Sequence, residues 1–175
     1  NKALGGIGAD RNNFSMTGKI AASGILESLL DSKRQLTQLG NYAFNRLFFG
    51  CSSLIVAPKL NAVDLGVSSY YYLFSGCTSL VEPPELKVET AFSAGMQGMF
   101  SNCTSLKYAP SINLRNSSSS CCADMFFGCT SLETAQCLSL EELSDNSYFR
   151  LFYINQKLNY IKTKQKSFVG CTNWT

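Results

Sequence analysis

The most reactive side chains in this 175-residue chain are its eight cysteines, and the sequence contains no histidine. A thiolate can be a nucleophile or a metal ligand, but both roles usually need a histidine or a second, closely spaced cysteine. The missing histidine excludes Ser-His-Asp triads, Cys-His dyads and histidine-bound metals, and no Cys-x-x-Cys pair occurs. We therefore predict that the chain is not an enzyme and holds no metal or cofactor.

Paired carboxylates offer no better candidate for catalysis. Glu141 and Glu142 are adjacent in sequence, so their side chains should point to different faces. Glu82 and Glu85 belong to one predicted strand segment and could face solvent together. We interpret both pairs as solvated surface charges.

Half of the cysteines recur at one constant interval along the chain, namely Cys51, Cys77, Cys103 and Cys129. Each stands in a motif such as Leu-Phe-Ser-Gly-Cys-Thr-Ser-Leu, which covers residues 73–80 in the second copy. A fifth, altered copy at 151–158 keeps the interval and has Asn155 in place of the cysteine. An unvarying period of this length predicts a stack of structural repeats.

Apolar side chains recur at fixed offsets from each cysteine. Positions seven, four and three residues before it are apolar in the five copies and share one face of a short helix. A leucine three residues after it leads into a short strand that is ended by proline in the first three copies. Stacking would align equivalent side chains, among them Phe74, Phe100 and Phe126, in one column. The polar segments 60–68 and 86–94 are interpreted as connections.

The repeated cysteine is best explained as a small, buried residue at a tight corner. Asn102 replaces the glycine that precedes the cysteine in other copies, which predicts a left-handed backbone there. An even number of cysteines allows disulfides, and Cys137 with Cys121 or Cys122 is the first pair to consider. The state of these three and of Cys171 stays open at this point.

The motif Met/Leu-Phe-x-Gly-Cys-Thr-Ser-Leu-x-x-Ala-Pro-x-Leu resembles the BspA-like leucine-rich repeats of surface proteins from gut and oral Bacteroidetes and from some protists. The resemblance covers the chain from about residue 14 onwards. It implies an α/β fold, a right-handed leucine-rich-repeat solenoid of about five coils. Short parallel strands would form one face and short helices or turns the other, with a cap at each end.

The chain divides into four segments around this single repeat domain. Residues 1–13 are glycine-rich and predict a flexible tail, and residues 14–40 predict an N-terminal cap with a strand at 14–22 and a short helix at 25–30. The repeats span residues 41–163. Residues 164–175 predict a C-terminal cap, and the resemblance implies that its ending is cut short.

Charge and hydropathy exclude two broad classes of function. The net charge of +3 is small and scattered, which gives no support for nucleic-acid binding. A membrane-spanning helix needs an apolar run of roughly 18 residues or more, and the sequence contains none, so we predict no transmembrane segment. The resemblance implies a cell-surface or extracellular protein, and we expect its signal peptide to have been removed.

The outward side of the strands is the candidate binding surface, because residues there vary while their neighbours do not. The resemblance implies a non-enzymatic adhesion module whose partner is a protein, for example a host matrix or surface protein. A carbohydrate-binding module that stacks glycans on tyrosines, and a structural spacer, remain the alternatives. The candidate contact residues are Val56, Lys59, Glu82, Glu85, Lys107, Tyr108, Glu133, Thr134 and Tyr160.

Overall fold

The computed structural model describes residues 17–31, 33, 35–140, 147–155, 157–158 and 160–163, and only the backbone of 136–140 and 160–163. The predicted tail 1–13, the first residues of the N-terminal cap and the C-terminal cap 164–175 lie outside this described part. Below, repeats 1 to 5 denote residues 41–66, 67–92, 93–118, 119–144 and 145–163.

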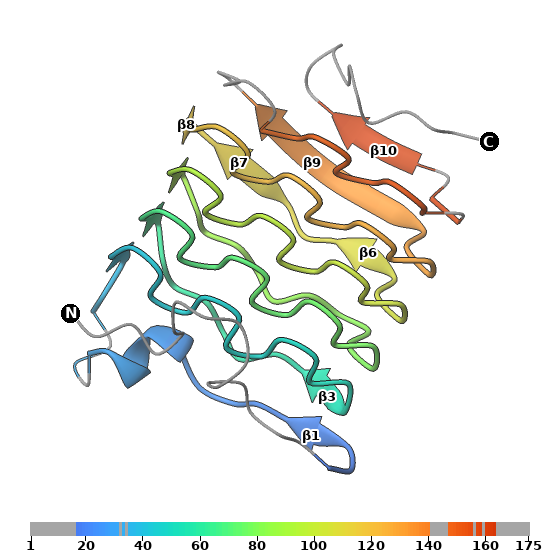
Figure 1. The fold of residues 1–175 in the computed structure, drawn as a ribbon, viewed down its shortest axis with the longest axis horizontal. Helices are drawn as coiled ribbons and strands as arrows, with labels where there is room; N and C mark the ends of the chain where they lie inside the picture. The colour runs from blue at the N-terminus through green and yellow to red at the C-terminus, as the bar shows by residue number, and fades with distance from the viewer. Residues whose placement is uncertain are drawn as a thin grey trace.

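Short parallel strands in three sheets, with almost no helix, make up the described part of the chain (Figure 1). The sheets have the orders β1-β3, β2-β4-β5-β8 and β10-β9-β6, and β7 also pairs with β9. The strands are β1 Ile20–Ala21, β2 Gln38–Leu39, β3 Leu54–Val56, β4 Asp64–Leu65, β5 Thr90–Ala91, β6 Tyr108–Ala109, β7 Ile112–Leu114, β8 Asn116–Ser117, β9 Thr134–Leu140 and β10 Tyr160–Thr163.

The most regular sheet includes two strands, β4 and β5, that lie where the sequence predicted only connections. Residues one repeat period apart are partners along β2, β4, β5 and β8, so that Asp64 faces Thr90 and Thr90 faces Asn116. The interpretation of 60–68 and 86–94 as irregular connections is therefore wrong. Each of these strands has two residues, which is too short for an alternating pattern to be recognised in the sequence.

The strand predicted after each cysteine forms in most repeats. It appears as β3 in repeat 1, β6 in repeat 3, β9 in repeat 4 and β10 in repeat 5. Repeat 2 has no strand there, because Pro83 and Pro84 stand side by side and neither has a backbone N–H to donate. Glu82 and Glu85 thus lie on an irregular segment, not on the strand expected for them.

The segment before each cysteine is built from turns, not from the predicted short helices. In repeat 1, Tyr42, Arg46 and Gly50 have φ angles of 58°, 55° and 73°, so every fourth residue is left-handed. The hydrogen bond from the Leu47 N–H to the Phe44 carbonyl, at 3.3 Å, closes a turn with Arg46 in third position, where type II turns require a positive φ. A left-handed residue at that interval excludes an α-helix.

These turns are joined to one another between repeats. The N–H groups of alternate residues donate to carbonyls of the next repeat, as from Phe44 to Ser69 and from Phe48 to Leu73, at 2.9 and 3.0 Å. The same pattern runs through repeats 2 to 4. Asn102 has a φ of 59°, which confirms the predicted left-handed position. We call the surface formed by these segments the turn face.

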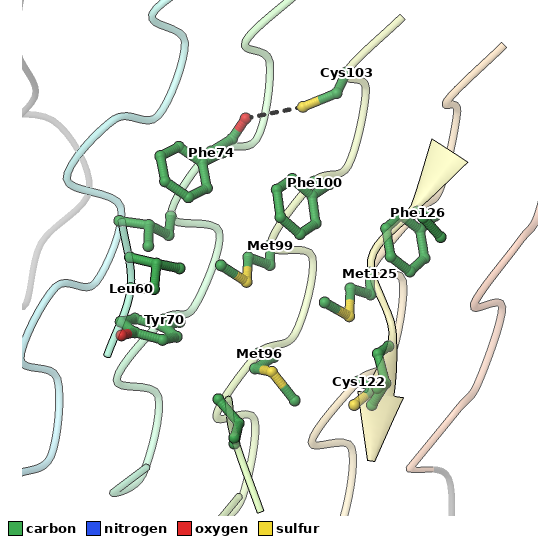
Figure 2. Close-up of a cluster of buried hydrophobic side chains, with 14 of the residues drawn as sticks. Leu60, Tyr70, Phe74, Met96, Met99, Phe100, Cys103, Cys122, Met125 and Phe126 are labelled. Atoms are coloured by element: carbon green, nitrogen blue, oxygen red, sulfur yellow. Dashed lines mark hydrogen bonds between the residues drawn. The ribbon is translucent and has the colours of Figure 1, made fainter. Parts of the chain in front are cut away.

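One column of phenylalanine rings runs through the core of all five repeats, and Figure 2 shows its three middle rings, Phe74, Phe100 and Phe126. Successive ring centroids lie 5.4, 5.7, 5.6 and 5.4 Å apart, and the planes differ by at most 18°. The predicted alignment of Phe74, Phe100 and Phe126 is confirmed. The remaining rings of the column are those of Phe48 and Phe152.

The repeated cysteines lie buried beside this column, as predicted. Three of the thiols donate a hydrogen bond of 3.1–3.2 Å to the phenylalanine carbonyl of the preceding repeat, one of which is dashed in Figure 2. Burial raises the pKa of the Cys129 thiol to about 12, so it stays protonated at neutral pH. The donor and acceptor pairs are Cys77 with Phe48, Cys103 with Phe74 and Cys129 with Phe100.

Cys121 and Cys122, which the sequence offered as disulfide partners of Cys137, are buried free thiols. Their sulfur atoms lie 3.6 Å apart in a hydrogen bond. This bond lowers the pKa of Cys121, while burial raises the pKa of Cys122. The side chain of Cys137 and the whole of Cys171 lie outside the described part of the chain.

The described part of the N-terminal cap is attached to the repeats through a buried carboxylate. The short 3-10 helix η1, Leu26–Leu29, confirms the helix predicted at 25–30, and β1 pairs with β3. Glu27 on η1 is 1% exposed. Its Oε1 accepts hydrogen bonds from the Ala62 N–H, at 3.0 Å, and from the Tyr70 hydroxyl.

Replacing Glu27 by alanine should lower the free energy of unfolding by about 3 kcal/mol, because a buried N–H and a buried hydroxyl both lose their acceptor. Urea unfolding followed by circular dichroism measures the change. Glu133→Ala, which removes an exposed carboxylate, is the matched control and should change stability by no more than about 0.5 kcal/mol. Equal effects of the two substitutions would show that the Glu27 contacts do not hold the cap.

Candidate interaction surface

The strand face consists of the residues four, five and eight positions after each cysteine. In repeat 1, the buried Leu54 is followed by the half-buried Ile55 and by Val56, which is 50% exposed. The same order recurs in repeat 3, where buried Leu106 precedes exposed Lys107 and Tyr108. The leucine inserts into the core, so the next two side chains are directed outward.

Three predicted contact residues lie in one row across neighbouring strands. The Cα partner of Tyr108 on β6 is Thr134 on β9, and the partner of Thr134 is Tyr160 on β10. Neighbouring strands lie about 4.8 Å apart, so Tyr108 and Tyr160 are two such steps from each other along the row. The side chain of Tyr160 lies outside the described part of the structure.

The same row continues from Tyr108 to Glu82 in repeat 2. Tyr108 and Glu82 stand at equivalent positions, five residues after Cys103 and Cys77, and both are exposed. Desolvation, and then the charge of Glu82, raise the pKa of the Tyr108 phenol, which keeps it a hydrogen-bond donor at neutral pH. An aromatic ring and a carboxylate therefore occupy equivalent, exposed positions on successive repeats.

A second row runs beside the first. The Lys107 N–H donates to the Val81 carbonyl at 3.2 Å, and the Glu133 N–H donates to the Lys107 carbonyl at 2.8 Å. The side chains of Val81, Lys107 and Glu133 are all exposed. An apolar, a basic and an acidic group therefore follow one another on successive repeats.

A hollow of about 270 Å³ separates repeats 1 and 2 on this face. It lies where repeat 2 lacks its strand, and its apolar lining includes Val56, which is 50% exposed, and Val81, which is 39% exposed. Sequence reasoning missed the two prolines in this lining, although Pro83-Pro84 in place of Ala-Pro was a visible signal. The lining residues are Ile55, Val56, Ala57, Val81, Glu82, Pro83 and Pro84.

Lys59 and Glu85 are exposed and occupy the third position of the strand face, eight residues after Cys51 and Cys77. The Lys59 carbonyl accepts a hydrogen bond from the Leu26 N–H, and the Lys59 N–H donates one to the Gly24 carbonyl, each at 2.9 Å. These bonds place Lys59 beside the N-terminal cap. Glu85 follows the two prolines of repeat 2. Seven of the nine predicted residues thus lie in the rows four and five positions after the cysteine positions, and these two lie at the eighth position.

No family model, curated protein or solved structure matches this chain. Within the described residues, no cluster of three or more Cys, Asp or Glu side chains could hold a metal ion. No helix in that part is long and apolar enough to cross a membrane.

Proposed function

We propose that this chain is a right-handed leucine-rich-repeat solenoid of the BspA-like type, and that it is a non-enzymatic module that binds a protein partner through the strand face. The repeat period, the parallel pairing of residues one period apart and the stacked phenylalanines support the solenoid. The turn face replaces the helices that such a solenoid was expected to carry. The resemblance supports a location at the cell surface or outside the cell.

One observation supports protein binding most directly, namely the apolar hollow between repeats 1 and 2. Val56 and Val81 expose large apolar side chains there, next to Tyr108. An exposed apolar patch with a polar rim is typical of protein interaction sites. Charged residues such as Lys107 and Glu133 provide that rim and would set the orientation of a partner.

Arrays of extracellular proteins and of glycans, probed with the labelled chain, test this function. Val56→Asp combined with Val81→Asp places two charges in the hollow and should weaken protein binding by about tenfold or more. Phe92→Asp is the matched control, because Phe92 is 53% exposed and lies outside the hollow. Protein binding that survives the double substitution would contradict the assignment of this surface.

A carbohydrate-binding module is the second candidate, and the exposed pair of Tyr108 and Glu82 on successive repeats favours it. A flat ring beside a hydrogen-bonding carboxylate is a suitable platform for a sugar. Reproducible binding to glycans that is lost in Tyr108→Ala would support this candidate over the first. Absence of binding on both arrays would leave the structural spacer as the remaining function.

A further inference from the structure

Two arginines occupy the same position of the turn face in repeats 1 and 5. Arg46 lies five residues before Cys51, and Arg150 lies five residues before Asn155, the position equivalent to the cysteine. Both have a positive φ, 55° and 49°, and both guanidinium groups stand over aromatic rings. Their surroundings are therefore comparable, except in one respect.

Arg150 is paired with a carboxylate from the preceding repeat. Its Nε and one terminal nitrogen donate to the two oxygens of Asp124, at 2.7 and 2.9 Å. The guanidinium carbon lies 5.4 and 5.0 Å from the ring centres of Phe127 and Phe149. This bidentate geometry is the one that arginine prefers for a carboxylate.

Arg46 has the aromatic surroundings but no carboxylate within the described part of the chain. Its guanidinium carbon lies 5.2 Å from the ring centre of Phe49 and 5.6 Å from those of Tyr71 and Tyr72. The Nε atom is buried and has no hydrogen-bond partner. A guanidinium that is partly removed from water by three rings attracts an anion more strongly than an exposed one.

The missing partner follows from the position of Arg46 in the first repeat. Asp124 stands one repeat period before Arg150, and the residue one period before Arg46 is Ile20. Ile20 belongs to β1, which pairs with β3, so this position of the cap lies beside a strand and not on the turn face. The described residues of the cap therefore supply no side chain equivalent to Asp124.

We propose that Arg46, with the rings of Phe49, Tyr71 and Tyr72, is a binding site for a carboxylate that another molecule supplies. The Asp124–Arg150 pair is the template for this contact: the carboxylate accepts from the Arg46 Nε and a terminal nitrogen, and the rings form an apolar wall beside it. The site lies on the turn face and is independent of the hollow on the strand face. The carboxylate comes from an acidic protein side chain or from an acidic sugar.

Nuclear magnetic resonance of the ¹⁵N-labelled chain tests the site through the arginine Nε–Hε signals. The probes are an acetylated glutamate-rich peptide, glucuronate and inorganic phosphate. A carboxylate probe should shift the Arg46 signal and leave the Arg150 signal in place, because Asp124 already occupies that guanidinium. A response to the peptide alone identifies a protein carboxylate, and a response to glucuronate identifies a sugar carboxylate.

Arg46→Lys keeps the positive charge but loses the planar fork, so the affinity for the responding probe should fall by about tenfold or more. Arg115→Lys is the matched control, because Arg115 is exposed and its ion pair with Glu89, at 3.5 Å, is remote in sequence from the aromatic cluster. That variant should bind as the original chain does. No shift of the Arg46 signal with either carboxylate, a shift with phosphate only, or an unchanged affinity in Arg46→Lys would overturn the proposal.

Discussion

Replacing Phe100 by alanine is expected to lower the free energy of unfolding by about 3–5 kcal/mol. Phe100 is fully buried, and its ring stacks on both sides, 5.7 Å from Phe74 and 5.6 Å from Phe126. The substitution leaves a cavity in the middle of the column and removes two ring contacts at once. Urea unfolding at neutral pH measures the loss.

Phe92→Ala is the matched control, because it removes the same side chain from an exposed position. It should change the free energy of unfolding by no more than about 0.5 kcal/mol. A loss below about 1 kcal/mol in Phe100→Ala would mean that the stacked rings contribute little to the stability of the repeats.

Raising the pH above 9 is expected to destabilise the fold, because the thiols lose their protons in the unfolded chain but keep them while they are buried. Burial raises the pKa of Cys129 from 9.0 to about 12 and also raises the pKa values of Cys77 and Cys103. A group with a raised pKa holds its proton longer in the folded state, so its contribution to stability is complete below pH 9 and is lost as the pH rises towards the folded value. Each such thiol lowers the free energy of unfolding by about 1.4 kcal/mol per pH unit, and three of them lower it by roughly 4 kcal/mol per pH unit.

Urea unfolding at pH 7, 9, 10 and 10.5 measures this dependence. Stability should be constant up to about pH 8.5 and then fall steeply, since the unfolded thiols titrate in that range. Cys103→Ala removes one of these buried thiols and should reduce the slope by about 1.4 kcal/mol per pH unit, whatever its effect at neutral pH. A stability that does not change between pH 9 and pH 10.5 would contradict the burial of these thiols.

The column positions were predictable because the repeat period alone determines which side chains meet. Phe74, Phe100 and Phe126 align, and Asn102 is left-handed, for reasons that are visible in one chain. The choice between helix and turn was not visible. Apolar residues seven, four and three positions before each cysteine are compatible with a short helix and with a series of turns, because both structures bury those positions on one side.

The candidate surfaces were predictable only in part. Outward positions such as Val56 and Tyr108 follow from the buried leucine that precedes them. The hollow is lined by residues of repeats 1 and 2, among them Pro83 and Pro84, so it is a property of the packed repeats. That Arg46 has no carboxylate partner among the described residues likewise depends on where the cap places Ile20, and no local pattern encodes that.

The hydrogen bonds between turns have a consequence for the curvature of the molecule. A helix is about 10 Å wide, whereas strands lie about 4.8 Å apart, so helices behind a parallel sheet force the array to bend. Here the turns of successive repeats are joined by backbone hydrogen bonds of 2.7–3.2 Å, which hold the back of the array at the strand spacing. The strand face and the turn face then advance by equal steps from repeat to repeat. A partner therefore meets a straight surface with evenly spaced repeats instead of a curved, horseshoe-shaped one.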